Sequence, residues 1–142
     1  MRISSEMRAA LAAAAIKARE SSYSPYSSFA VGAALLTGSG KIYLGANIEN
    51  ASYTPTVCAE RVAIFKAVSE GERELVAIAI AGGPASEEAK SDTAPCGVCR
   101  QVMAEFADGE LEIILAREDG YTVMTLEELL PLRFDKKNLN RD

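Results

Sequence analysis

The sequence predicts an α/β fold in which helices cover both faces of a single sheet. Predicted strands alternate with predicted helices along the chain, which is the pattern of such a layered arrangement. The segment Leu75 to Ala81 (LVAIAIA) is continuously apolar, as expected for a strand that is covered on both faces. The length of 142 residues suits one domain, so residues 1–142 are assigned to a single domain.

Local patterns define each element of this fold. Helices show apolar residues three or four positions apart, and strands are short apolar runs bounded by turn-forming residues. Gly38-Ser39-Gly40 separates two such runs and indicates a hairpin turn. In chain order, we expect a helix over 4–20, strands over 29–36 and 41–47, a helix over 58–69, a strand over 75–81, a helix over 96–106, strands over 111–116 and 121–124, and a helical turn over 125–128.

Helix faces and ends follow from individual residues. Thr56 precedes the second helix as a possible N-cap, Gly71 follows its end, and Pro131 stops the last helical turn. The buried face of the first helix is expected to consist of Met7, Leu11, Ala14, Ala15 and Ala18.

Composition excludes several classes of partner. The net charge is −5 and there is no stretch dense in Lys and Arg, whereas nucleic-acid binders usually present a basic face. We therefore expect no nucleic-acid partner. No apolar run approaches the ~18 residues of a membrane span, and the N-terminal segment is amphipathic rather than a signal peptide. We expect no membrane partner and a cytoplasmic location.

The chain contains three cysteines and no histidine. An odd number of cysteines argues against a disulfide framework. Without histidine, the usual acid–base residue and the commonest metal ligand are both missing. Proton transfer near neutral pH must therefore come from Glu, Asp, Cys, Lys or a metal-bound water.

The strongest motif is Pro95-Cys96-Gly97-Val98-Cys99. Residues three apart share one face of a helix, so both sulfurs can reach one ion. Alone, this motif also fits a redox pair, half of a structural zinc site, or chance. Cys58 lies at a second predicted helix start, and three thiolates leave a fourth zinc position open for water, which is typical of catalytic zinc. The alternative for Cys58 is a buried apolar thiol.

Two charged residues follow Cys58 closely. Glu60 lies two positions beyond this candidate ligand, where it could move protons above a metal without binding it. Its alternative is a solvated carboxylate that stabilises a helix start. Three thiolates and Zn²⁺ sum to −1, so we hypothesise that the Arg61 guanidinium hydrogen-bonds the sulfurs and withdraws charge. The alternative for Arg61 is an ion pair at a surface or subunit interface.

Together, these motifs resemble the signature of the zinc deaminases. Three further segments are similar to the small cytidine deaminases: 24–35 (SPYSSFAVGAAL), 45–50 (GANIEN) and 99–102 (CRQV). The resemblance covers Ser24 to Phe134, with departures at Thr54 and over 91–94. It implies a three-layer α/β/α sandwich with a five-stranded mixed sheet, one zinc ion per chain, and a homotetramer with active sites at subunit interfaces.

The resemblance also implies roles for individual residues. Cys58, Cys96 and Cys99 would bind zinc, with Glu60 as the catalytic residue. Substrate contacts would come from Phe29 on the nucleoside, Asn47 and Glu49 on the ribose hydroxyls, the Ala59 backbone on the pyrimidine, and Tyr53 and Phe134 at a neighbouring subunit's site. As alternatives, Phe29 could be a core residue, Asn47 a turn residue, and Phe134 a cap on its own fold.

The expected reaction is hydrolytic deamination of cytidine and deoxycytidine to the uridine nucleosides and ammonia, as in pyrimidine salvage. Three alternatives remain. A deaminase of a related aminopyrimidine, such as the antibiotic blasticidin S, would share the cysteines and Glu60. A nucleic-acid-editing deaminase would need a basic channel, which this acidic chain lacks. A structural zinc module would need a fourth ligand.

Overall fold

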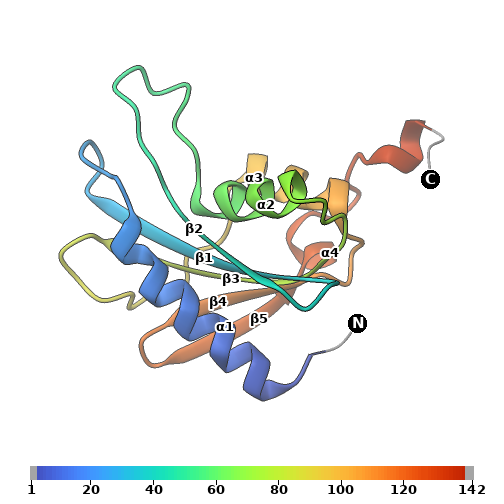
Figure 1. Cartoon of the computed structure of the whole chain (residues 1–142), viewed down its shortest axis with the longest axis horizontal. Coiled ribbons are helices and arrows are strands. Elements are labelled where there is room, and N and C mark those ends of the chain that lie inside the picture. The colour runs from blue at the N-terminus through green and yellow to red at the C-terminus, as the bar shows by residue number, and fades with distance from the viewer. Residues whose placement is uncertain (1–2, 140–142) are drawn as a thin grey trace.

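The computed structural model describes residues 3–139. A single five-stranded mixed sheet lies between two layers of helix (Figure 1), which confirms the predicted three-layer α/β/α fold. In chain order the elements are α1 (Ser5–Ala18), the 3₁₀ helix η1 (Arg19–Ser21), β1 (Phe29–Thr37), β2 (Ile42–Ala46), α2 (Ala59–Ser69), β3 (Leu75–Pro84), α3 (Gly97–Phe106), β4 (Glu112–Arg117), β5 (Gly120–Thr125), α4 (Leu126–Leu129) and the 3₁₀ helix η2 (Lys136–Leu139).

The strands are ordered β2-β1-β3-β4-β5 across the sheet. β1 pairs antiparallel with both β2 and β3, whereas β3 and β4 are parallel. α1 covers one face and α2, α3 and α4 cover the other (Figure 1). Within residues 3–139, no helix combines the length and apolar character needed to cross a membrane.

Strand register gathers three chain segments at one edge of the sheet. Phe29, the first residue of β1, pairs with Pro84, the last residue of β3. Ala46, the last residue of β2, pairs with Gly32 near the start of β1. The connections that leave β2 and β3 toward α2 and α3 therefore begin at the same edge, which brings the two helix starts close together.

β3 supplies the centre of both apolar layers, as its continuous apolar sequence predicted. Ile78 and Ile80 are fully buried on the side of α2 and α3. Ala77, Ala79 and Ala81 are fully buried on the side of α1. The alternation of large and small side chains follows from the two-residue period of a strand, and the alanines allow α1 to lie close to the sheet.

The structure corrects three local expectations. The first helix ends at Ala18 and continues as η1, rather than running to Glu20 as one α-helix. β3 continues to Pro84, because it pairs with β1 along the whole length of that strand. Thr56 is not the N-cap of α2: Cys58 occupies that position, and the Thr56 hydroxyl accepts a hydrogen bond from the Asn50 N–H.

Candidate functional site

Two helix starts bring the three cysteines together. Cys58 is the N-cap residue of α2, Cys96 is the N-cap residue of α3, and Cys99 lies in the first turn of α3. The Sγ atom of Cys96 is 3.6 Å from that of Cys58 and 3.5 Å from that of Cys99. All three sulfurs lie within 4.8 Å of one another. The sequence predicted all three cysteines as ligands; spacing on one helix accounts for Cys96 and Cys99, and the fold brings Cys58 to them.

The spacing of these sulfurs suits a tetrahedral zinc site. Zinc–sulfur bonds of about 2.3 Å in tetrahedral geometry place two sulfurs about 3.8 Å apart, close to the separations in this cluster. Cys99 is buried, Cys58 is half-buried and Cys96 is exposed. Three thiolates would therefore hold the metal from the protein side and leave a fourth position for water.

Hydrogen bonding within the cluster favours thiolate at Cys58. The pKa of Cys58 is lowered to about 5, because its sulfur accepts hydrogen bonds from the Cys99 thiol and from Arg61. The pKa of Cys99 is raised, because Cys99 donates to Cys58 and is also buried. Cys58 therefore favours the thiolate form that zinc binding requires, and metal binding would displace the remaining thiol protons.

Glu60 is a buried carboxyl group beside the sulfurs. It is only 3% exposed, and its Oε1 atom has no hydrogen-bond partner among residues 3–139. Burial, together with the negative charge at Cys58, raises the pKa of Glu60 to about 7. This burial argues against the alternative of a solvated helix-start carboxylate. A carboxyl group of this kind can both accept and release a proton near neutral pH.

Arg61 points toward the sulfurs. Its Nη2 atom donates to the Sγ atom of Cys58 over 3.5 Å, and this contact raises the pKa of the guanidinium. Across the described residues, Arg61 forms no ion pair with a carboxylate. The geometry therefore favours the charge-compensation hypothesis over an ion pair within the chain.

A hollow of about 320 Å³ lies beside the loops that follow η1 and β2. Its lining residues are Tyr26, Ser27, Glu49, Tyr53 and Thr56. The rings of Tyr26 and Tyr53 meet edge to face, with centroids 6.1 Å apart and an interplanar angle of 70°. Tyr53 is 70% exposed and has a positive φ of 63°. The hollow therefore combines aromatic surfaces with one carboxylate, a lining that suits a polar ring compound.

The two candidate ribose-binding residues are held firmly by backbone groups. The Glu49 Oε1 atom accepts from the Tyr26 N–H (2.9 Å) and the Ser27 N–H (3.1 Å), and Oε2 accepts from the Ser27 hydroxyl. The Asn47 Oδ1 atom accepts from the Val31 N–H (2.9 Å), and its Nδ2 atom donates to the Phe29 carbonyl (2.8 Å). Asn47 also accepts from a hydroxyl group at Ser22 (2.6 Å).

The other predicted contact residues differ in exposure. The Phe29 side chain is 40% exposed, which disfavours the alternative of a core residue. Ala59 is fully buried as the first residue of α2. Phe134 is 60% exposed and lies outside the lining of the hollow, although its carbonyl accepts from Gln101 (2.8 Å).

Two residues whose roles the sequence did not reveal support this site. Ser27 contacts Glu49 through both its N–H and its hydroxyl. Arg100 donates to the Pro95 carbonyl (2.8 Å) and to the Leu129 carbonyl (2.7 Å), which fixes the chain just before Cys96. The position of Ser27, two residues before a predicted strand, was a usable signal, because such serines often bond the backbone two residues on.

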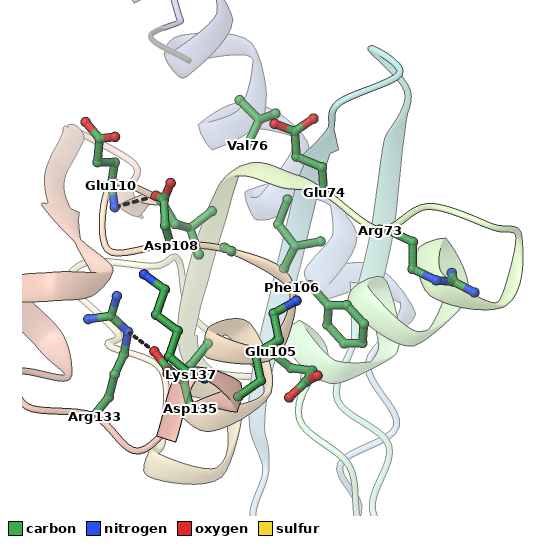
Figure 2. Close-up of a pocket in the computed structure, with 15 residues that line it drawn as sticks. Arg73, Glu74, Val76, Glu105, Phe106, Asp108, Glu110, Arg133, Asp135 and Lys137 are labelled. Carbon is green, nitrogen blue, oxygen red and sulfur yellow. Dashed lines mark hydrogen bonds and ion pairs between the residues drawn. The ribbon is translucent and has the colours of Figure 1, made fainter. Parts of the chain in front are cut away.

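A second pocket, of about 290 Å³, lies away from the cysteines (Figure 2). Its walls come from the start of β3, the end of α3 and the segment around Arg133 and Lys137. Charged groups of both signs line it, among them Arg73, Glu105 and Asp108 (Figure 2). β3 and α3 approach the cysteines with their opposite ends, so this pocket is separate from the candidate site.

Comparison with known proteins agrees with this geometry. The family model of the cytidine and deoxycytidylate deaminase zinc-binding region matches residues 5–115. The cytidine deaminase of Halalkalibacterium halodurans is 50% identical over 127 residues, which are 89% of this chain and 92% of that protein. The crystal structure of cytidine deaminase from Burkholderia pseudomallei superposes with a TM-score of 0.81 at 44% identity, covering 93% of this chain and 100% of that one.

A more distant relative carries a different substrate name. The blasticidin-S deaminase of Bacillus cereus is 33% identical over 109 residues, which are 75% of this chain and 77% of that protein. The family match covers all of the cysteine motifs and most of the strands described above. This chain therefore belongs to the cytidine and deoxycytidylate deaminase family of zinc-binding proteins.

Proposed function

We propose that this protein hydrolyses cytidine and deoxycytidine to uridine and deoxyuridine, with release of ammonia. The observation that carries the proposal is the three-sulfur cluster beside the buried carboxyl group of Glu60, whose Oε1 atom has no hydrogen-bond partner among residues 3–139. The 50% identity to a cytidine deaminase over most of the chain supports the substrate class. A structural zinc module does not explain a buried titratable carboxyl beside the metal ligands.

Different residues of the chain perform different parts of the reaction. Cys58, Cys96 and Cys99 would hold a zinc ion, which supplies an acidified water when bound. Glu60 takes a proton from the attacking water and delivers it to N3 of the pyrimidine. The water oxygen bonds to C4, where it becomes a hydroxyl group. Glu60 then moves the proton of this hydroxyl group to the exocyclic amino group, so that the C4–N bond breaks, C4 becomes a carbonyl carbon and ammonia leaves. Because burial raises the pKa of Glu60 to about 7, its carboxyl group can both accept and release a proton near neutral pH.

Asn47 and Glu49 favour a nucleoside over the blasticidin-S alternative. Glu49 has several acceptor sites on its two oxygens, and the amide nitrogen of Asn47 retains a second N–H. These groups match ribose hydroxyls, which both donate and accept. Phe29 would pack on the nucleoside, and the backbone of Ala59 would contact the pyrimidine.

The experiment is ultraviolet monitoring of the purified zinc-loaded protein with four substrates: cytidine, deoxycytidine, cytidine monophosphate and blasticidin S. We expect both nucleosides to be deaminated with the highest kcat/KM. The monophosphate should be poor, because Glu49 and the net charge of −5 repel a phosphate. A higher kcat/KM for blasticidin S or the monophosphate would replace the proposed substrate.

The assembly we propose is a homotetramer that acts in the cytoplasm, binds one zinc per chain, and has neither nucleic acid nor membrane as a partner. Large apolar side chains lie exposed among the described residues, which supports their being covered by further subunits. They include Tyr53 (70% exposed), Phe134 (60%) and Val98 (57%). Light scattering should give four times the chain mass, and Phe134→Ser should weaken the assembly if this residue reaches a neighbouring subunit.

A further inference from the structure

We propose that Ser27 is a positioning residue, which orients the ribose-binding carboxylate of Glu49 and joins it to the backbone that carries Phe29. This inference rests on the proposed function. By orienting Glu49, the Ser27 hydroxyl group would control the selectivity of the site between nucleosides that differ in their ribose hydroxyls.

The hydroxyl of Ser27 occupies a junction between two substrate contacts. It donates to the Glu49 Oε2 atom and accepts from the Phe29 N–H over 3.0 Å. A hydroxyl group can do both at once, because it has one donor and two acceptor positions. Alanine at this position would leave both neighbours without that partner, whereas threonine would keep the hydroxyl.

The same backbone unit is held from its other side by Asn47. The Phe29 N–H is bound by Ser27, and the Phe29 carbonyl is bound by the Asn47 Nδ2 atom at 2.8 Å. Glu49, Ser27, Phe29 and Asn47 thus form one continuous chain of hydrogen bonds. Within this chain, the Ser27 hydroxyl bonds directly to the Glu49 carboxylate and to the Phe29 N–H.

Glu49 depends strongly on this loop. Three of its accepted hydrogen bonds come from the adjacent residues Tyr26 and Ser27. The Ser27 hydroxyl makes the largest contribution to lowering the pKa of Glu49. Because the Ser27 side chain is exposed, its hydroxyl contributes little to the core, so it can be removed with a small effect on the fold.

The chain offers a matched control. Ser39, in the turn between β1 and β2, also donates its hydroxyl to a glutamate carboxylate, that of Glu72. This turn lies at the end of β1 opposite Phe29. Ser39→Ala therefore removes the same kind of hydrogen bond at a place remote from the candidate site.

The test compares cytidine with 3′-deoxycytidine in the wild type and in Ser27→Ala, Ser27→Thr and Ser39→Ala. A hydrogen bond to a charged group is worth roughly a factor of ten or more. Ser27→Ala should raise KM for cytidine about 10-fold, with kcat nearly unchanged and 3′-deoxycytidine affected less than about 2-fold. Ser27→Thr should restore the wild-type values, and Ser39→Ala should keep them.

A loss that is equal for both nucleosides, or that threonine does not restore, would overturn the positioning role. Carboxyl-carbon NMR titration of Glu49 gives a readout that does not depend on turnover. Its pKa should rise in Ser27→Ala and remain low in Ser27→Thr, and an unchanged pKa in Ser27→Ala would contradict the proposal. If the wild type itself fails to deaminate cytidine, the proposed function falls while this titration still decides the role of Ser27.

Discussion

Gly45 and the carbonyl oxygen of Ala59 are in such close contact that a Cβ atom on Gly45 would lie 2.3 Å from that oxygen. The same Cβ would lie 2.7 Å from the backbone nitrogen of Ala63. The backbone of α2 therefore rests directly on β2. This contact fixes the start of α2, from which Cys58 and Glu60 project.

Gly45→Ala should displace α2 from the sheet, because the new methyl group meets backbone rather than a flexible side chain. We expect a loss of about 1–3 kcal/mol in the free energy of unfolding, as for other overpacked sites, and reduced zinc occupancy. Denaturant unfolding and metal analysis measure the two effects. Gly38→Ala is the control, because its Cβ would meet the flexible side chain of Glu74 rather than backbone. Equal losses of unfolding free energy in both variants would disprove the special role of the Gly45 contact.

Glu60→Gln should retain the fold and bound zinc, because Gln is nearly isosteric and Glu60 is not among the three sulfur ligands. Turnover of cytidine should fall by about 10²–10⁴, the range for loss of a general acid–base group. Steady-state kinetics on samples of verified zinc content measure this. A variant with more than a tenth of wild-type turnover would rule out Glu60 as the proton carrier.

Arg61→Gln should lower metal affinity or turnover by about 10–100-fold, because a group that hydrogen-bonds a metal ligand has an effect of this size. Its donor to the Cys58 sulfur would be lost. Cys58→His lowers the negative charge of the site independently, so the double variant should lose much less than the sum of the two single losses. Simple addition of the losses, measured by chelator competition and kinetics, would favour a structural or interface role instead.

Arg100→Lys should loosen the segment that leads into Cys96. The guanidinium binds the carbonyl groups of Pro95 and Leu129 together, and a lysine ammonium lacks this planar fork. We expect a loss of about 1.5–3 kcal/mol in unfolding free energy and faster release of zinc to a chelator. Arg73→Lys, at an exposed arginine that also binds two carbonyl groups, is the control. Zinc release as fast in the control as in Arg100→Lys would contradict this anchoring role.

The sequence by itself determined the α/β class, the two-sided burial of β3 and the paired sulfurs of Cys96 and Cys99. These features depend on short-range periodicity, since residues three apart share a helix face and an unbroken apolar run suits a strand covered on both sides. The absence of histidine likewise restricted the proton carrier to a few residue types.

Only the tertiary structure decided how distant segments meet. Cys58 reaches Cys96 because the ends of β2 and β3 lie at one edge of the sheet, which is a matter of strand pairing. The sequence predicts an end of β3 at Ala81, whereas the strand continues to Pro84, because its length is set by pairing with β1 rather than by local composition. The burial of Glu60 and the link from Ser27 to Glu49 likewise arise from packing between segments far apart in the sequence, which local patterns do not encode.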